Sequence, residues 1–362
     1  MKQSKSEKYL GDIVDKSGKN KANIEARQAK GYGIVTNIIA IINEIPLGHW
    51  RVEAGLRLRQ AMLVNGCLFN SEVWHDLKMA EIKLLEKVDE YLLRGIINGH
   101  SKLPVEALYL ETGSLPIRFI ISSRRLMYLH SILQKDSQEL VKKVYEAQKK
   151  CVTPGDFIEL VNEDKKLINL GISEEEIKST KKQKFKNVIK TKIRNAAYKS
   201  LKMLKENHSK MSGLVFDKLE QAEYLSSPLF NNESAKLLLA LRTRTVNGIK
   251  NDFRGMFTEN KCPFSCDSID TLQHLLECSV LRQQHVSDNV SASNVRYSDI
   301  FSSSITRQKQ VTQLYSELLE IRNNLMDSQS ETWTRAQAVN LCKSSSILSS
   351  NDIYGMTFGN KN

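Results

Sequence analysis

The residues best suited to chemistry are three cysteines and one histidine in a short window, Cys262, Cys266, His274 and Cys278. They can supply three thiolates and one imidazole, which are the four ligands of a tetrahedral Zn²⁺ site with no position left open for water. A closed site of this kind stabilises a fold and does not catalyse. The sequence therefore predicts a structural zinc site at these four residues.

The spacing of the second pair of ligands predicts a short helix. Ser268 or Asp270 is expected to cap a helix that begins near Thr271. His274 and Cys278 are four residues apart, so one helical turn places them on the same face. We expect this turn to bring the last two ligands to one metal ion.

Two other interpretations of the cysteines stay open at this point. They could be separate buried thiols beside a surface histidine, or two of them could form a disulfide. The N-terminal residues are polar, with no apolar core of a secretory signal. We therefore expect an intracellular protein, in the nucleus, the cytoplasm or both, where reducing conditions favour a metal site over a disulfide.

Composition predicts a mainly α-helical chain. Of its 362 residues 41% are hydrophobic, only six are proline and 17 are glycine. The longest wholly apolar runs, residues 38–42 and 237–241, are far shorter than the roughly 20 residues of a membrane helix. We expect no membrane partner, and no motif predicts a small-molecule substrate.

The net charge of +12 is concentrated in residues 178–205, which hold eleven Lys or Arg and no Asp or Glu. Apolar residues recur there at three- and four-residue steps, as on one face of an amphipathic helix: Phe185, Val188, Ile189, Ile193, Ala196, Ala197, Leu201 and Leu204. The cations expected to contact nucleic-acid phosphate are Lys181, Lys182, Lys186, Lys190 and Arg194. A solvated lysine-rich helix and an acidic membrane surface are the alternatives.

A second basic group precedes the metal site. Asn232 is expected to cap a helix that includes Leu237 and continues through the cations towards Cys262. These cations are also expected to contact RNA or DNA: Arg242, Arg244, Lys250 and Arg254.

The expected elements begin with a short strand at 8–15, followed by a turn at 16–20. We expect a short β-hairpin in this N-terminal region. Periodic apolar residues and Pro or Gly breaks then predict a series of helices. Their expected ranges are 23–45, 51–74, 78–97, a short helix opened by Pro104, one from Pro116 through Leu133, 137–150, 156–168, one beginning at Ser173, the basic helix, and 306–325.

Several runs in order resemble the region downstream of the catalytic palm in reverse transcriptases of non-LTR (LINE-type) retrotransposons. They cover about residues 8–280 and begin at Lys8 (Lys-Tyr-Leu-Gly-Asp-Ile), Glu25 (Glu-Ala-Arg-Gln-Ala-Lys-Gly), Leu63 (Leu-Val-Asn-Gly-Cys-Leu-Phe-Asn-Ser-Glu-Val-Trp), Glu106 (Glu-Ala-Leu-Tyr-Leu-Glu-Thr-Gly), Leu115 (Leu-Pro-Ile-Arg), Arg124 (Arg-Arg-Leu-Met-Tyr-Leu-His) and Leu241 (Leu-Arg-Thr-Arg-Thr).

The resemblance implies a thumb-like bundle of helices that binds nucleic acid, followed by a zinc knuckle. The implied divisions are residues 1–22 as the end of the palm with its primer-grip hairpin, 23–150 as the thumb-like domain, 151–229 as a connector with the basic helix, 230–286 as a helix plus the Cys-Cys-His-Cys knuckle, and 287–362 as a polar, partly disordered tail with one helix.

The departures from the family concern catalysis. Polymerisation in this family requires a Tyr-x-Asp-Asp motif and an earlier Asp that hold two metal ions, and the chain contains no Asp-Asp pair. We expect no catalytic residues and no polymerase activity in the chain alone, with a separate polypeptide as a candidate source of the palm. A helical scaffold whose basic helix binds an acidic protein, and an unfolded remnant of such an element, are the alternatives.

Overall fold

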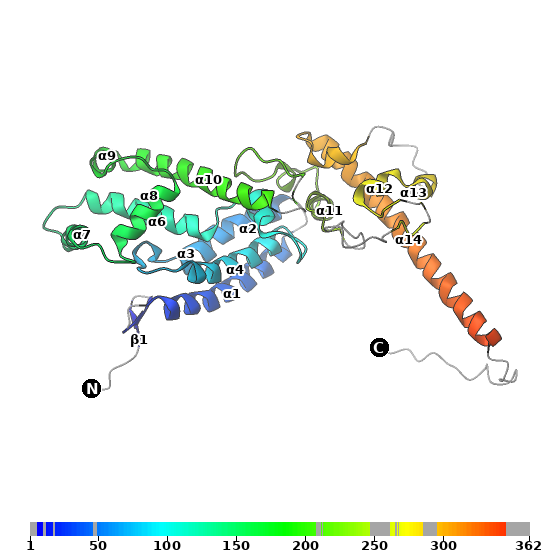
Figure 1. Ribbon diagram of the computed structural model, residues 1–362, viewed down its shortest axis with the longest axis horizontal. Helices are drawn as coiled ribbons and strands as arrows, with labels where there is room; N and C mark the ends of the chain where they lie inside the picture. The colour runs from blue at the N-terminus through cyan, green and yellow to red at the C-terminus, as the bar shows by residue number, and fades with distance from the viewer. Residues whose placement is uncertain are drawn as a thin grey trace.

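The computed structural model describes residues 6–9, 12–16, 19–45, 49–207, 211, 213–246, 261–264, 266, 268–284 and 295–344. These residues form a mainly helical protein with a two-stranded antiparallel hairpin near the N-terminus and a Cys/His cluster near the C-terminus. The predicted fold class is therefore confirmed. A helical bundle occupies one end of the molecule, and α11 to α14 form the other (Figure 1).

The N-terminal hairpin consists of β1 (Ser6–Tyr9) and β2 (Asp12–Asp15), paired in the register Ser6 to Asp15 through Tyr9 to Asp12. The prediction of one strand over 8–15 was wrong, because the chain reverses direction between Tyr9 and Asp12. Three side chains hold the hairpin on the bundle through the Asp12 carboxylate. Asn23 and Asn70 donate to it at 3.0 and 2.9 Å, and Arg27 pairs with it.

The first bundle helix, α1 (Lys21–Glu44), lies against α4 (Met79–Ile96). The two helices run parallel, because Gly31 faces Val88 and Gly95 faces Ile39. Both helices agree with the predicted ranges within two residues. Their contact forms the side of the bundle that carries the hairpin (Figure 1).

The segment between them is not the single helix predicted over 51–74. It consists of α2 (His49–Leu58), a π-helical turn (Arg59–Val64), α3 (Asn65–Cys67) and a 3-10 turn (Ser71–Val73). The π turn begins at Arg59, whose guanidinium bonds the buried Asp89 carboxylate at 2.5 and 2.7 Å. The helix cannot continue past Asn70, which has a φ of 59° in the left-handed region.

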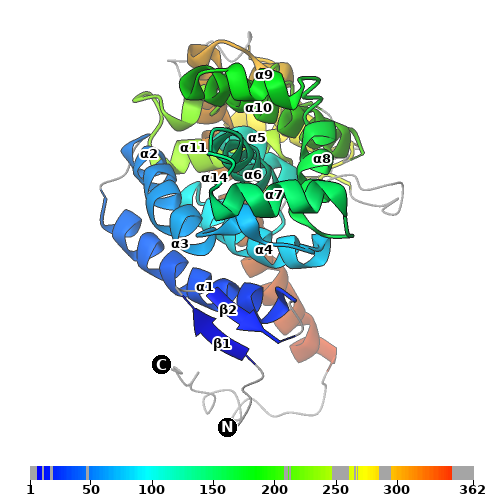
Figure 2. The ribbon, with the colours of Figure 1, turned by 90° about the vertical axis from the view of Figure 1, so that its left-hand side faces the viewer.

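The centre of the bundle contains α5 (Val105–Thr112) and α6 (Ile117–Leu133), each opened by a proline as predicted. Around them lie α7 (Leu140–Lys150), α8 (Phe157–Leu167), α9 (Glu174–Ser179) and α10 (Lys182–Glu206). Ser173 and Glu176 form the expected capping box of α9. Figure 2 shows α10 on the opposite side of the bundle from the hairpin, with α6 between them.

The C-terminal part begins after a 3-10 turn (Glu223–Leu225) with α11 (Asn232–Arg242), whose cap is Asn231 and not the predicted Asn232. Next come α12 (Leu272–Glu277), α13 (Ser279–Gln284), a further 3-10 turn (Tyr297–Phe301) and α14 (Ile305–Ser344). The last helix is 40 residues long and so extends well beyond the predicted end at 325. Its second half projects away from the body (Figure 1).

One continuous hydrophobic core runs from Val35 in α1 to Leu318 in α14. The first half of α14 contributes Val311, Leu314 and Tyr315 to it, so this helix is part of the folded body. A smaller cluster around Trp74 packs the α3 segment against α1 and α6. Within the described residues, no helix has the length and apolar character of a membrane-spanning segment.

Candidate metal centre and basic helix

The structure brings the four predicted metal ligands together. Their ligand atoms all lie within 4.8 Å of one another. The Sγ atom of Cys278 is 3.9 Å from that of Cys262 and 3.4 Å from that of Cys266. Two thiolates on a tetrahedral Zn²⁺, each about 2.3 Å from the metal, are about 3.8 Å apart. A disulfide would need about 2.05 Å, so the disulfide interpretation does not fit, and the three thiols are free.

Short local contacts position these ligands. Lys261 and Ile269 form an isolated antiparallel bridge, and the Cys262 amide donates to the Ser268 carbonyl at 2.8 Å. The cap of α12 is Thr271, whose hydroxyl accepts from the His274 amide at 3.1 Å, so the prediction of Ser268 or Asp270 was wrong. His274 lies in the first turn of α12, and Cys278 ends the helix.

The histidine has the arrangement of a metal ligand. Within the described residues, Nε2 of His274 is buried and makes no hydrogen bond. A buried ring nitrogen without a partner costs free energy unless a metal or another group occupies its lone pair. Cys262 and Cys278 are also buried, and Cys266 is half-buried. The donor set and its geometry therefore fit a metal ion such as zinc.

The long helix α14 supports this centre from outside, a feature that local spacing could not predict. Arg322 donates to the Asp270 carboxylate at 2.6 Å, and both groups are largely buried. The Tyr315 hydroxyl donates to the Leu272 carbonyl at 2.7 Å. These bonds join residues 43 and 52 positions apart and fix the start of α12.

The basic helix presents four of its five predicted cations to solvent. Lys181, Lys182, Lys186 and Lys190 are exposed at or near the start of α10. Within the described residues, no carboxylate lies within 4.0 Å of any of their ammonium groups. We call these residues the lysine row.

The opposite face of α10 is buried at every fourth residue from Phe185 to Leu201. Val188 and Ala196 flank this stripe, whereas Leu204 is exposed, contrary to the prediction. The α10 stripe packs on α5 and α6. The lysine row therefore belongs to a helix whose apolar face already has a partner within the chain.

The fifth cation of α10 has a structural role. Arg194 is half-buried and donates to the backbone carbonyls of Gly113, at 3.3 Å, and Leu219. The Tyr198 hydroxyl and the Lys205 ammonium bind carbonyls of the same neighbouring segment, those of Phe216 and Leu214. The C-terminal half of α10 is thus held by backbone acceptors, and Arg194 is not a free cation.

The second predicted basic group is not a continuous helical surface. Arg242 is buried, with its Nε 2.9 Å from a carboxylate oxygen of Glu111 and its Nη1 3.2 Å from the Ile300 carbonyl. The prediction that Arg242 contacts phosphate is wrong, because its charge is already paired inside the protein. The helix α11 ends at Arg242 instead of continuing, and Arg244 is half-buried with a φ of 51°. Lys250 and Arg254 lie outside the described residues.

Comparison of the chain with protein-family models, curated proteins and solved structures gave no match. The resemblance to non-LTR reverse transcriptases stays a prediction from the sequence blocks.

Proposed function

We propose that this chain is a nucleic-acid-binding part of a non-LTR retrotransposon reverse transcriptase, which binds RNA or DNA and does not polymerise by itself. The observation that carries the proposal is the lysine row on α10. From Lys182 to Lys190 it extends about 12 Å along the helix. Exposed ammonium groups without carboxylates nearby attract phosphate and release its counterions on binding.

The metal centre has a supporting role in this proposal. With three cysteines and one histidine it would hold Zn²⁺ as a closed structural site. Its ligands come from the segment before α12, from α12 and from the residue that ends this helix, so the metal would hold these parts together. We propose that it maintains a surface for RNA or DNA beside the body formed by α11 and α14.

The test is titration of a labelled RNA hairpin and a DNA duplex with the purified chain, with and without a zinc chelator. We expect binding to both nucleic acids, which weakens on chelation. Replacing Lys182, Lys186 and Lys190 by glutamine should weaken binding strongly. A matched variant replaces three exposed lysines elsewhere, Lys143, Lys150 and Lys236, and should bind nearly as the wild type does.

The alternative is a helical scaffold that binds an acidic protein through the same lysine row. Titration with polyglutamate separates the two functions. Binding to polyglutamate without binding to either nucleic acid would contradict our proposal and favour the scaffold. Primer extension on an RNA template by the purified chain would contradict the expected lack of polymerase activity.

A further inference from the structure

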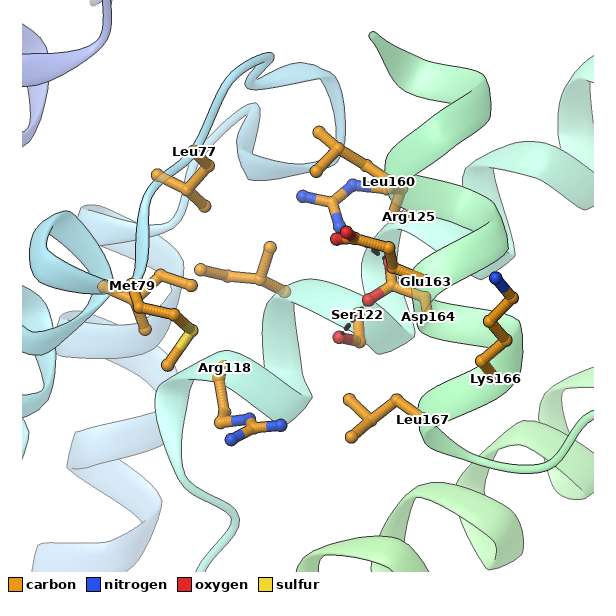
Figure 3. Close-up of a pocket in the computed structure, with 12 residues that line it drawn as sticks. Leu77, Met79, Arg118, Ser122, Arg125, Leu160, Glu163, Asp164, Lys166 and Leu167 are labelled. Carbon is orange, nitrogen blue, oxygen red and sulfur yellow. Dashed lines mark hydrogen bonds and ion pairs between the residues drawn. The ribbon is translucent and has the colours of Figure 1, made fainter. Parts of the chain in front are cut away.

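A second candidate site lies on the bundle and shares no residue with the metal centre or the lysine row. It is a cavity of about 430 Å³ between the start of α4, the middle of α6 and α8 (Figure 3). Six of its twelve lining residues are apolar. The apolar lining residues are Leu77, Met79, Ile82, Ile121, Leu160 and Leu167.

A buried ion pair lies at one side of this cavity. Nη1 of Arg125 in α6 is 2.7 Å from a carboxylate oxygen of Asp164 in α8, and the Ser122 hydroxyl donates to the other oxygen at 2.5 Å. All three side chains are buried. Asp164 therefore has a hydrogen-bond partner for each oxygen, and Arg125 is its ion-pair partner.

Arg125 has donors that this ion pair does not use. Within the described residues, its Nε is buried without a hydrogen-bond partner, and its Nη2 makes no hydrogen bond. Nε has no accessible surface, so Nη2 is the donor on this edge of the guanidinium that a carboxylate oxygen in the cavity can reach. Figure 3 shows the guanidinium of Arg125 directed towards the open space between Leu77 and Leu160.

The charged side chains that line the cavity have a net positive charge. Arg118 and Lys166 lie at the rim with Glu163, so the cavity and its rim carry three cationic and two anionic side chains. Among the described residues that line the cavity, no aromatic side chain offers a surface on which a nucleic-acid base could stack. The lining therefore favours one carboxylate with aliphatic neighbours over a polyanion.

We propose that this cavity binds a segment of a partner protein in which an Asp or Glu side chain is flanked by leucine-like side chains. The carboxylate would accept from Nη2 of Arg125, and the aliphatic side chains would cover Met79, Ile82 and Leu160. A volume of this size is in the range that binds compact ligands. The site would give the chain a protein partner in addition to nucleic acid.

The test is fluorescence anisotropy with a labelled peptide, Gly-Ser-Leu-Leu-Asp-Leu-Ser-Gly, and its Asp-to-Asn counterpart. We expect the Asp peptide to bind about tenfold more tightly, because a charge-assisted bond is lost with Asn. Met79→Glu places a like charge at the mouth and should weaken binding about tenfold or more. Met79 is 49% exposed, so the variant keeps the fold. The control is Met203→Glu on α10, a residue that is 68% exposed and does not line the cavity.

Arg125→Lys is the second variant, since it keeps a cation beside Asp164 and loses the free Nη2 donor. It should bind the Asp and Asn peptides equally. If this variant does not fold, Met79→Glu still decides the matter. Equal binding of the two peptides by the wild type, no binding of either, or binding unchanged in Met79→Glu would overturn the proposal.

Discussion

Replacing Arg242 by methionine should destabilise the protein by about 3–5 kcal/mol, because it leaves a buried carboxylate without its ion-pair partner. Nε of Arg242 is 2.9 Å from Oε1 of Glu111, and the two side chains are 7% and 0% exposed. Water cannot reach Glu111 to replace the lost partner. Within the described residues, the other oxygen of Glu111 already makes no hydrogen bond.

The charge of Arg242 supports a loss of this size in the free energy of unfolding. Burial lowers the pKa of Arg242, but the neighbouring Glu111 raises it more, so that the pKa lies above its ordinary value. Arg242 is therefore charged at every pH of the assay. Methionine fills a similar volume and removes the charge along with the bond to the Ile300 carbonyl. The expected loss is thus mainly electrostatic.

The assay is urea unfolding followed by circular dichroism, with the free energy of unfolding extrapolated to water. The matched control is Arg57→Met, since Arg57 is 79% exposed and its pair with Glu53 lies within one helix. This control should lose at most about 1 kcal/mol. The double variant Arg242→Met with Glu111→Leu should recover most of the stability, because replacing both members of a buried pair is nearly neutral. A loss in Arg242→Met as small as that in the control would refute the reasoning.

Three further predictions concern the metal centre, a titrating carboxyl and a turn. One equivalent of Co²⁺ should bind to the wild type and give the visible absorption of a tetrahedral thiolate site, whereas the Cys278→Ser variant should lose this absorption. The same spectrum in the wild type and the variant would contradict the four-ligand site. Burial and the neighbouring Glu86 raise the pKa of Glu90 to about 7. The native state therefore holds a proton that the unfolded state releases, and stability should fall as pH rises from about 4.5 to about 7. Glu90→Gln should stabilise the protein at pH 8 by about 1 kcal/mol, after allowance for solvent screening of this half-buried group, and should raise its melting temperature accordingly. At pH 4 the substitution should change the melting temperature little. An equal effect at both pH values would exclude this titration. Gly113 has a φ of 63°, and a Cβ there would lie 2.3 Å from the Gln221 amide nitrogen. Gly113→Ala should cost at least about 1 kcal/mol in thermal unfolding, whereas Gly171→Ala, in open space, should not.

Much of the fold could be predicted because its signals are local. Apolar periodicity and the prolines at 104 and 116 were sufficient for α1, α4, α5 and α6. The segment over 51–74 could not be predicted, because its π turn begins at Arg59, whose partner Asp89 is 30 residues away. A helix-forming sequence does not show where a tertiary bond will interrupt it.

For the candidate sites too, local signals could be predicted and contacts between distant residues could not. The metal ligands lie within 17 residues, and their spacing alone predicted the cluster. The roles of the arginines could not be predicted, because Glu111 is 131 residues from Arg242 and the acceptors of Arg194 come from two separate segments. The cavity beside Arg125 was also missed, since three distant elements form it.

The most direct test of nucleic-acid binding is the slope of log K against log salt concentration for the wild type and the variant with Lys182, Lys186 and Lys190 replaced by glutamine. If the lysine row neutralises four phosphates, the slope should be about −2.8 for single strands and about −3.6 for a duplex. Loss of three lysines should reduce its magnitude by about 2 to 3. A slope near zero, or the same slope in both proteins, would contradict the account.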